Sequence, residues 1–522
     1  MYDAKNGLWV AHCQDGPLSI IGKMANRHGL VAGATGTGKT VTLQVMAETF
    51  CQAGVPCFMA DMKGDLSGIS QPGRLSGFIE KRMAEFGIEA PRFQSCPVRF
   101  YDVFGQQGHP LRCTVSQMGP QLLSRVLGLN DTQEGVLNIV FRIADERGLL
   151  LLDIKDLRSM LNYVQAHASE YSSVYGNIAS ASVGAIQRSI LTLENEGADQ
   201  FFGEPSFDIQ DLLACEGGKG VMSVLAADRL MMKPKLYSTF LLWLLSELYS
   251  TLPEVGDMDL PKLVFFFDEA HMLFDDTPKA LTDKIEQVVR LIRSKGVGVY
   301  FVTQSPTDIP ESILGQLGNR VQHALRAFTP KDQKAVKVAA ETFRANPAFD
   351  TSEAIMNLGT GEALVSFLDE KGAPGVVQKA KILFPLSQIG AIDASQRSQL
   401  IKSSRIYGKY DTPVDRESAF EVLLAQARKD EEEAAAEVQA KETEKKSAKG
   451  LFGKLAKAVV TAVTASVAAS VGTAVSNKVA GGKTHKTKKV STGNKVVKSA
   501  TSAATRTVTR ELSRSILGNL IK

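Results

Sequence analysis

The chain has 522 residues, 44% hydrophobic and 22% charged, which supplies one large core or two ordinary ones and excludes a chain that is disordered throughout. The net charge of +4 hides an asymmetry, because residues 445–522 hold 16 Lys or Arg and one acid, about +15, which leaves about −11 for residues 1–444. We therefore expect a soluble globular protein with a separate basic tail.

Short apolar runs bounded by Gly, Pro or Asp predict a buried, mostly parallel sheet. Several runs lack in/out alternation, as expected of strands covered on both faces. Helical patterns such as 40–52 and 283–293 lie between many of them, which is the order of a doubly wound α/β domain. The predicted strands are 28–32, 56–60, 98–103, 220–225, 263–267, 299–303, 323–327, 363–367 and 382–384.

The pattern changes at two points along the chain. After Gly105 it becomes helical, with a plausible helix cap at Asn130. After Pro385 the strand signals stop, and 429–446 is a polar run that suits a solvated helix. We predict five regions: the first part of the α/β core at 1–104, a mainly helical insertion at 105–215, the second part of the core at 216–400, a charged helical linker at 401–446 and a flexible Ala/Val/Lys-rich tail, disordered or amphipathic, at 447–522.

A phosphate-binding loop is the first chemical motif. An apolar run is followed by G-x-x-x-x-G-K-T and then by a helical pattern, a context that a chance glycine-rich turn would lack. The glycines allow backbone N–H groups to face phosphate oxygens, Lys39 adds a charge at the β- and γ-phosphates, and the Thr40 hydroxyl completes a Mg²⁺ shell. ATP and Mg²⁺ are therefore the predicted ligands. The predicted nucleotide-binding residues are Gly33, Ala34, Thr35, Gly36, Thr37, Gly38, Lys39, Thr40 and Val41.

Two carboxylates follow the apolar run 263–267. Asp268 is expected to help bind Mg²⁺, and Glu269 is placed to polarise the attacking water, since transfer of a phosphoryl group to water needs a positioned base. The alternative is that the pair only caps the next helix, because acidic residues favour helix N-termini. The phosphate loop in the same chain favours the catalytic interpretation.

Two further polar residues end predicted strands. Gln304 follows 299–303 and is a candidate to sense the γ-phosphate or hold the water; alternatively it only orders the proline turn after it. Asp61 follows 56–60 and is a candidate to orient water or metal, although Asp-x-x-Gly-Asp is also ordinary turn chemistry.

Together these four motifs resemble the HerA/FtsK superfamily of hexameric DNA-pumping ATPases, with Asp-Glu-Ala-His at 268–271 and Thr-Gln-Ser-Pro at 303–306 as the more specific part. The run 318–330 looks like the bacterial HerA-like group often labelled YjgR, and the resemblance covers about residues 5–400. It implies a RecA-like core of the additional-strand type, a six-membered ring, and ATP hydrolysis that drives translocation on DNA. About 27 residues precede the first predicted core strand, so the β-barrel of archaeal HerA is not carried over.

The resemblance also implies that an arginine from a neighbouring subunit completes each ATP site. Arg293 lies where the family carries a basic segment before the glutamine strand and is the first candidate, with Arg320 and Arg326 behind it. The alternative is a solvated arginine at a helix end.

Predicted partners depend mainly on the tail. The net-acidic residues 1–444 show no cluster of aromatic and basic residues, whereas lysines in 483–498 would bind DNA phosphates non-specifically or simply keep the chain soluble. Valines spaced by four within 458–476 favour a helix that self-associates or rests on an anionic membrane, and a partner protein is a further possible contact of the basic tail.

Six cysteines without metal-ligand spacing, and no signal peptide, predict a cytoplasmic location, with peripheral membrane contact through the tail as an alternative. The main interpretation is an ATP-hydrolysing hexameric DNA translocase or helicase. Its rivals are a nucleotide-dependent switch or scaffold without translocation, and a membrane-associated secretion- or conjugation-type ATPase.

Overall fold

The computed structural model describes the chain except for residues 1, 4–6, 257, 275–278 and 447–522. Residues up to Glu431 form one compact unit, and a second unit begins at Glu432. The predicted basic tail, including the valine-spaced helix, lies outside the described residues. In the part that is described, no helix is both long and apolar enough to cross a membrane.

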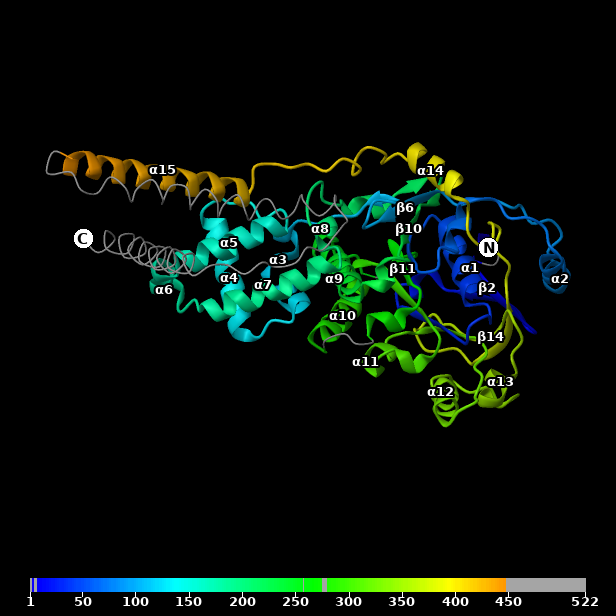
Figure 1. The fold of residues 1–522 in the computed structure, drawn as a ribbon. Helices are drawn as coiled ribbons and strands as arrows, with labels where there is room; N and C mark the ends of the chain where they lie inside the picture. The colour runs from blue at the N-terminus through cyan, green and yellow to red at the C-terminus, as the bar shows by residue number, and fades with distance from the viewer. Residues whose placement is uncertain (1, 4–6, 257, 275–278, 447–522) are drawn as a thin grey trace, which may run out of the picture. The chain divides into compact units, whose positions relative to one another are not determined.

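A 13-stranded sheet runs through the described part of the first unit (Figure 1). Its order is β1-β2-β15-β14-β13-β4-β12-β11-β5-β10-β6-β7, with β3 paired to β2, and β8 and β9 form a separate hairpin. In chain order the strands are β1 (Tyr2–Asp3), β2 (Gly7–Cys13), β3 (Gly16–Ile20), β4 (Gly29–Ala32), β5 (Cys57–Asp61), β6 (Val98–Asp102), β7 (His109–Pro110), β8 (Cys215–Glu216), β9 (Lys219–Gly220), β10 (Met222–Ala226), β11 (Leu263–Phe267), β12 (Val297–Thr303), β13 (Asn319–Gln322), β14 (Glu362–Ser366) and β15 (Gln378–Ile382).

All pairs from β13 across to β7 are parallel, whereas β14, β15, β2, β3 and β1 extend the sheet in antiparallel fashion. The strand before the phosphate loop, β4, is separated from the acidic strand β11 by β12. That extra strand between the two is the mark of the additional-strand type, so the predicted RecA-like α/β core is confirmed.

Helices cover both faces of this sheet and fill the predicted insertion. In chain order they are α1 (Lys39–Gln52), α2 (Gly77–Phe86), α3 (Val115–Leu127), α4 (Asp131–Glu146), α5 (Ile154–Ala166), α6 (Ala168–Tyr175), α7 (Ser180–Asn195), α8 (Ala198–Phe201), α9 (Pro234–Thr251), α10 (Lys279–Ile292), α11 (Glu311–Leu314), α12 (Pro330–Glu341), α13 (Thr351–Asn357), α14 (Ala394–Ser403) and α15 (Ala419–Lys446). Asn130 caps α4, since its side chain accepts from the Gln133 N–H, as the sequence predicted. The predicted domain limits remain a prediction.

The absence of alternation in the central strands has a direct cause. Along β11, Leu263, Phe265 and Phe267 pack into one core with α9 and α10, and Val264 and Phe266 pack into a second core with α1. Because each face of the sheet is covered by helices, every residue of the strand is buried.

The strands before β4 were not predicted, and two predicted strands need correction. The N-terminal lead before β4 is part of the sheet, because β2 pairs with β15 and forms a hairpin with β3. The strand predicted at 323–327 is β13, four residues earlier, and the apolar residues after it bury instead in a small core with α12 and α13. The strand predicted at 382–384 is β15, whose polar and apolar residues alternate because it is antiparallel and only half buried.

His28, just before β4, is a buried histidine held neutral by the fold. The Val299 N–H donates to its Nδ1 over 3.0 Å, and its Nε2–H donates to the Val289 carbonyl oxygen over 2.8 Å. A second proton would remove the acceptor at Nδ1. Burial accordingly lowers the pKa of His28 to about 4.

We expect this histidine to weaken the fold in acid. Its pKa in the unfolded chain is about 6.5, so between pH 6.5 and 4 only the unfolded chain takes up the proton. The stabilising effect is complete above pH 6.5 and is lost at about 1.4 kcal/mol per pH unit as the pH falls toward 4. Urea unfolding at pH 7.5, 6 and 5 should give a steeper loss of stability for the wild type than for His28→Gln. Equal slopes would contradict the assignment.

Candidate active site

The register of the sheet brings the predicted site residues to one edge. Thr303 of β12 pairs with Ala32 of β4, and Phe267 of β11 pairs with Ala60 of β5. The residues that follow these positions are the phosphate loop, Gln304, the acidic pair and Asp61. Four motifs far apart in sequence therefore meet at the carboxyl edge of four adjacent strands, where ligands bind in α/β sheets.

The phosphate loop connects β4 to α1. Gly36 and Gly38 have φ of 76° and 114°, which side chains with a Cβ rarely adopt, and Gly38 is the N-cap of α1. The Lys39 ammonium is buried and donates to the carbonyl oxygens of Gly33 over 2.6 Å and Ala34 over 3.1 Å. Thr40 and Val41 lie in the first turn of α1. The loop thus presents backbone N–H groups, a lysine and a hydroxyl, which is the donor set that a triphosphate and Mg²⁺ require.

Two residues that sequence reasoning missed support this loop from behind. His323 lies against Gly33, where a Cβ would come within 2.5 Å of the histidine Cβ. The His323 ring is 2.8 Å from the Thr42 hydroxyl and 3.0 Å from the Glu362 carbonyl oxygen. The Gly361 N–H donates to the Thr37 carbonyl oxygen over 2.9 Å. His323 falls within the run 318–330 that carries part of the family resemblance, but its support of the loop is identified only by the three-dimensional structure.

Glu269 has the most unusual backbone in the site. Its φ of 47° and ψ of 47° place a non-glycine residue in the left-handed region, which costs of the order of 1 kcal/mol. Its Oε1 accepts from the Lys63 ammonium over 2.6 Å, and its Oε2 accepts from the Gln304 amide over 3.3 Å. The Nδ1 of His271 is 3.4 Å from Oε2 without forming a hydrogen bond. Burial alone would raise the pKa of Glu269, but Lys63 and Gln304 lower it overall.

Three buried carboxyl oxygens near Glu269 have no hydrogen-bond partner among the described residues: one each on Asp61, Asp65 and Asp268. Burial raises the pKa of Asp268 to about 6 and that of Asp61 to about 7, with neighbouring carboxylates adding to both shifts. Unpaired buried carboxylates are costly unless a cation compensates them. Together with the Thr40 hydroxyl, Asp268 fits an oxygen-coordinated cation such as Mg²⁺.

The candidate arginines lie elsewhere. Arg293 begins a short 3-10 helix directly before β12, at the amino edge of the sheet, a full strand away from Gln304. It cannot reach the phosphate loop of its own subunit. Arg320 donates to three backbone carbonyl oxygens, those of Leu317, Thr342 and Leu314, which gives it a structural role. Arg326 is exposed and donates to the Met356 carbonyl oxygen.

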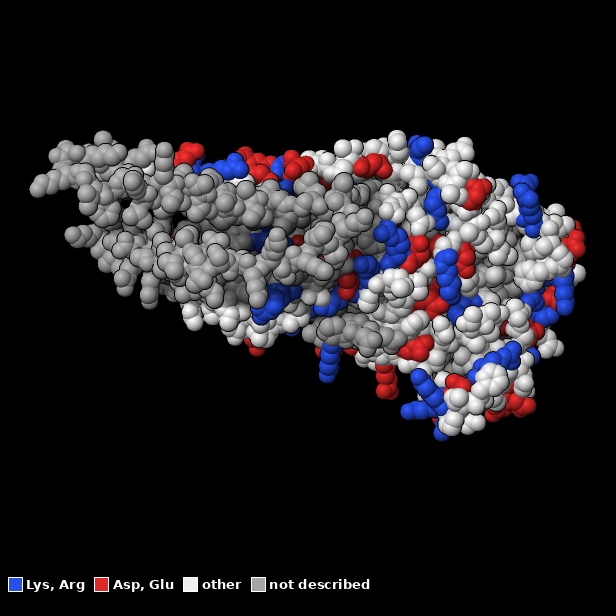
Figure 2. Space-filling view, viewed as in Figure 1, with Lys and Arg blue, Asp and Glu red and all other residues white. Residues whose placement is uncertain are grey.

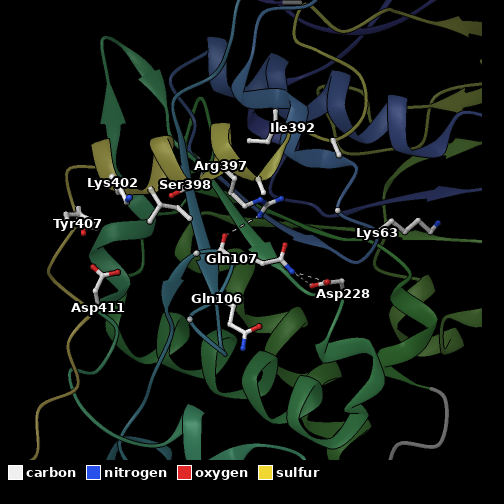
Figure 3. Close-up of a pocket in the computed structure, with 16 residues that line it drawn as sticks. Lys63, Gln106, Gln107, Asp228, Ile392, Arg397, Ser398, Lys402, Tyr407 and Asp411 are labelled. Carbon is white, nitrogen blue, oxygen red and sulfur yellow. Dashed lines mark hydrogen bonds between the residues drawn. The ribbon is translucent and has the colours of Figure 1, made fainter.

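A polar cavity of about 630 Å³ adjoins the loop after β5 (Figure 3). Arg397 of α14 projects into it and donates to the Gln107 carbonyl oxygen over 3.4 Å, and the Gln107 amide donates to Asp228 over 3.0 Å. Lys63 is on the wall of this cavity, but Figure 3 shows its ammonium directed away from the other three side chains. Sequence reasoning singled out neither residue: Lys63 lies within the Asp-x-x-Gly-Asp turn, of which only Asp61 was considered, and Arg397 lies in a stretch without a motif.

Parts of this sequence are similar to those of known proteins. Two curated relatives, each named DNA double-strand break repair helicase HerA, are 32% identical over 99 residues in Sulfolobus acidocaldarius and 33% identical over 109 residues in Sulfurisphaera tokodaii. These matches cover 19% and 21% of this chain, and the same shares of the two relatives. The chain therefore aligns with about a fifth of the length of each.

Among solved structures, the plasmid coupling protein TrwB in complex with a non-hydrolysable ATP analogue superimposes with a TM-score of 0.49 at 15% identity, over 72% of this chain and 91% of that one. VirB4 of Thermoanaerobacter pseudethanolicus gives a TM-score of 0.45 at 15% identity, over 76% of this chain and 100% of that one. The model of the family described as Helicase HerA-like C-terminal matches residues 8–522. Since that match spans nearly the whole sequence, the chain belongs to the HerA-like family of P-loop ATPases, which confirms the resemblance drawn from its motifs.

Proposed function

We propose that the chain hydrolyses ATP with the help of Mg²⁺ at the carboxyl edge of β4, β12, β11 and β5. The observation that carries this proposal is that the phosphate loop, Gln304 and the acidic pair end adjacent strands and face one site. Lys39 would bind the β- and γ-phosphates, and Thr40 and Asp268 would hold the ion. Mg²⁺ bound there would neutralise charge on the phosphates.

Glu269 is the proposed general base. It would take a proton from the water that attacks the γ-phosphorus atom, while Gln304 would hold that water or sense the γ-phosphate. The hydrogen bond from Gln304 to Glu269 keeps the two side chains within reach of one molecule. Asp61 follows Ala60, the partner of Phe267, so it is adjacent to Asp268 and would orient water or the ion from the other side.

We further infer that hydrolysis drives an oligomeric motor, six-membered as its resemblance implies, which translocates on DNA. Family membership and the relatives named as DNA repair helicases support this. Lys and Arg are interspersed with Asp and Glu over the face in Figure 2, so the core offers no single basic patch there. The basic tail is therefore the proposed non-specific contact with DNA, a membrane or a partner protein. All six cysteines are free thiols, which supports a cytoplasmic location.

Replacing the proposed base tests the enzyme directly. We expect Glu269→Gln to lower kcat by about a hundredfold or more, because general base catalysis is lost, while ATP binding persists. Glu80→Gln, at an exposed position of α2, is the matched control and should keep wild-type turnover. The measurement is steady-state ATP hydrolysis with and without duplex and single-stranded DNA.

The same assay separates the motor from its rivals. DNA should stimulate the wild type severalfold and leave the Glu269→Gln variant inactive. Hydrolysis that is indifferent to DNA would favour the nucleotide switch or the membrane-associated ATPase instead. A folded wild type that hydrolyses no ATP would overturn the enzyme proposal.

If Asp268 helps to hold Mg²⁺, replacing it should change the Mg²⁺ requirement of hydrolysis. Asp268→Asn should raise the Mg²⁺ concentration needed for half-maximal hydrolysis by about tenfold or more, because an amide compensates the ion's charge poorly. Nucleotide binding in EDTA should change little. Asp228→Asn, two residues after β10 at the same sheet edge, is the control. An unchanged Mg²⁺ requirement would remove Asp268 from the ion site.

If Arg293 acts on the ATP site of a neighbouring subunit, two inactive variants should restore ATPase activity to each other in a mixed oligomer. We expect Arg293→Ala and Glu269→Gln each to be inactive alone, since the first lacks the arginine and the second lacks the base. In an equal mixture, half the intact bases would neighbour an intact arginine, so activity should return to about a quarter of the wild-type value. Arg326→Ala mixed in the same way tests the exposed Arg326 as the alternative candidate. A mixture that stays inactive would exclude Arg293 as the trans-acting group.

A further inference from the structure

The ion pair between Lys63 and Glu269 is the contact that the proposed reaction does not use. Lys63 lies two residues after β5, and its side chain is 46% exposed, whereas the Glu269 side chain is only 7% exposed. The 2.6 Å distance between the Lys63 ammonium and Oε1 is short for an ion pair. A half-exposed cation thus contacts a buried carboxylate whose residue has left-handed backbone angles.

This contact affects the base directly. A carboxylate oxygen has two lone pairs and accepts a proton through one of them; the Lys63 ammonium takes one lone pair of Oε1, and the Gln304 amide takes one of Oε2. An ammonium at hydrogen-bond distance also competes with the water for that oxygen. While the ammonium is bound, its positive charge stabilises the ionised carboxylate and makes Glu269 a weaker general base. Hydrolysis is therefore slower while Lys63 stays in place.

The surroundings of Lys63 show how it would leave. Its loop forms part of the wall of the 630 Å³ cavity, so solutes reach the lysine from solvent. Lys402 and Arg397 of α14 line the same cavity, whereas the Lys63 ammonium is directed away from them (Figure 3). A phosphate oxygen would compete with Glu269 for the Lys63 ammonium, because lysine binds phosphate groups as a point charge.

We propose that Lys63 is a positioning residue that restrains Glu269 and exchanges it for a phosphate group, so that arrival of the phosphate frees the base. The inference rests on the proposed ATPase function. The phosphate belongs either to a nucleic-acid backbone that enters the cavity or to the terminal phosphate of bound ATP. Both share the chemistry of a phosphate oxygen facing an ammonium.

The test compares three variants for kcat and KM of ATP hydrolysis. Lys63→Met keeps the length of the side chain and removes its charge, Lys63→Arg keeps the cation, and Lys402→Met removes another lysine from the same cavity. Each is assayed alone, with a 30-nucleotide single strand and with inorganic phosphate at matched ionic strength. We expect Lys63→Met to raise basal kcat about three- to tenfold with KM changed less than about twofold, Lys63→Arg to stay at or below the wild type, and Lys402→Met to keep the basal rate.

The three conditions identify the source of the phosphate. If the nucleic acid supplies it, the single strand stimulates the wild type and adds little to Lys63→Met, while inorganic phosphate is ineffective. If ATP supplies it, Lys63 divides between Glu269 and the terminal phosphate even at saturating ATP, so Lys63→Met still raises basal kcat, and the single strand stimulates the wild type and Lys63→Met by the same factor. A fall in kcat for Lys63→Met, an unchanged kcat, or a change confined to KM would each overturn the proposal.

A second measurement separates this inference from the ATPase proposal. Melting temperatures of Lys63→Met, Glu269→Gln and the double variant report the ion pair whether or not the protein hydrolyses ATP. We expect the shift of the double variant to differ from the sum of the two single shifts. Non-additive shifts in a protein without ATPase activity would refute only the proposed function, whereas additive shifts would refute the pairing itself.

Discussion

The in-register parallel pairing of β4, β12, β11 and β5 is the constraint on which the site depends. Each strand is buried on both faces, so its length and end are set by packing against two helical layers. Because the paired residues end at one edge, the loop after each strand opens toward the same space. A shift of the β11 register by one residue would move each of the side chains of Asp268 and Glu269 to the other face of the sheet. One of the two carboxylates would then be buried in a hydrophobic core.

Electrostatics explains why this edge needs a ligand. Asp61, Asp65 and Asp268 bring buried carboxyl oxygens together without partners among the described residues, and the pKa values of all three are raised. Lys63 is the cation that acts on Asp65 and Asp268, Arg397 is the one that acts on Asp61, and burial lowers the pKa of Lys39. Charge is thus unbalanced at fixed positions, which is the preorganisation that binding of a cation and a polyanion together would relieve.

The sequence predicted the parts of the site that carry local patterns. An apolar run precedes the phosphate loop, Asp268–Glu269 and Gln304. Such a run followed by a polar turn can be recognised in the sequence alone. Lys63 and His323 were missed because their contacts with Glu269 and Thr42 join residues more than 200 positions apart. The N-terminal hairpin was missed for a similar reason, since β2 completes the sheet by pairing with β15, at the other end of the core.

The position of β12 has a consequence for how a ring of such subunits would work. Arg293 precedes this seven-residue strand and Gln304 follows it, so a single rod of about 23 Å separates the two side chains. A buried strand hydrogen-bonded on both sides hardly changes length. Any displacement of Arg293 when a neighbouring nucleotide loses its phosphate would reach Gln304 as a shift of similar size. ATP hydrolysis would then proceed from subunit to subunit in one rotational direction. That direction would be set by the handedness of the ring and not by the polymer on which the ring moves.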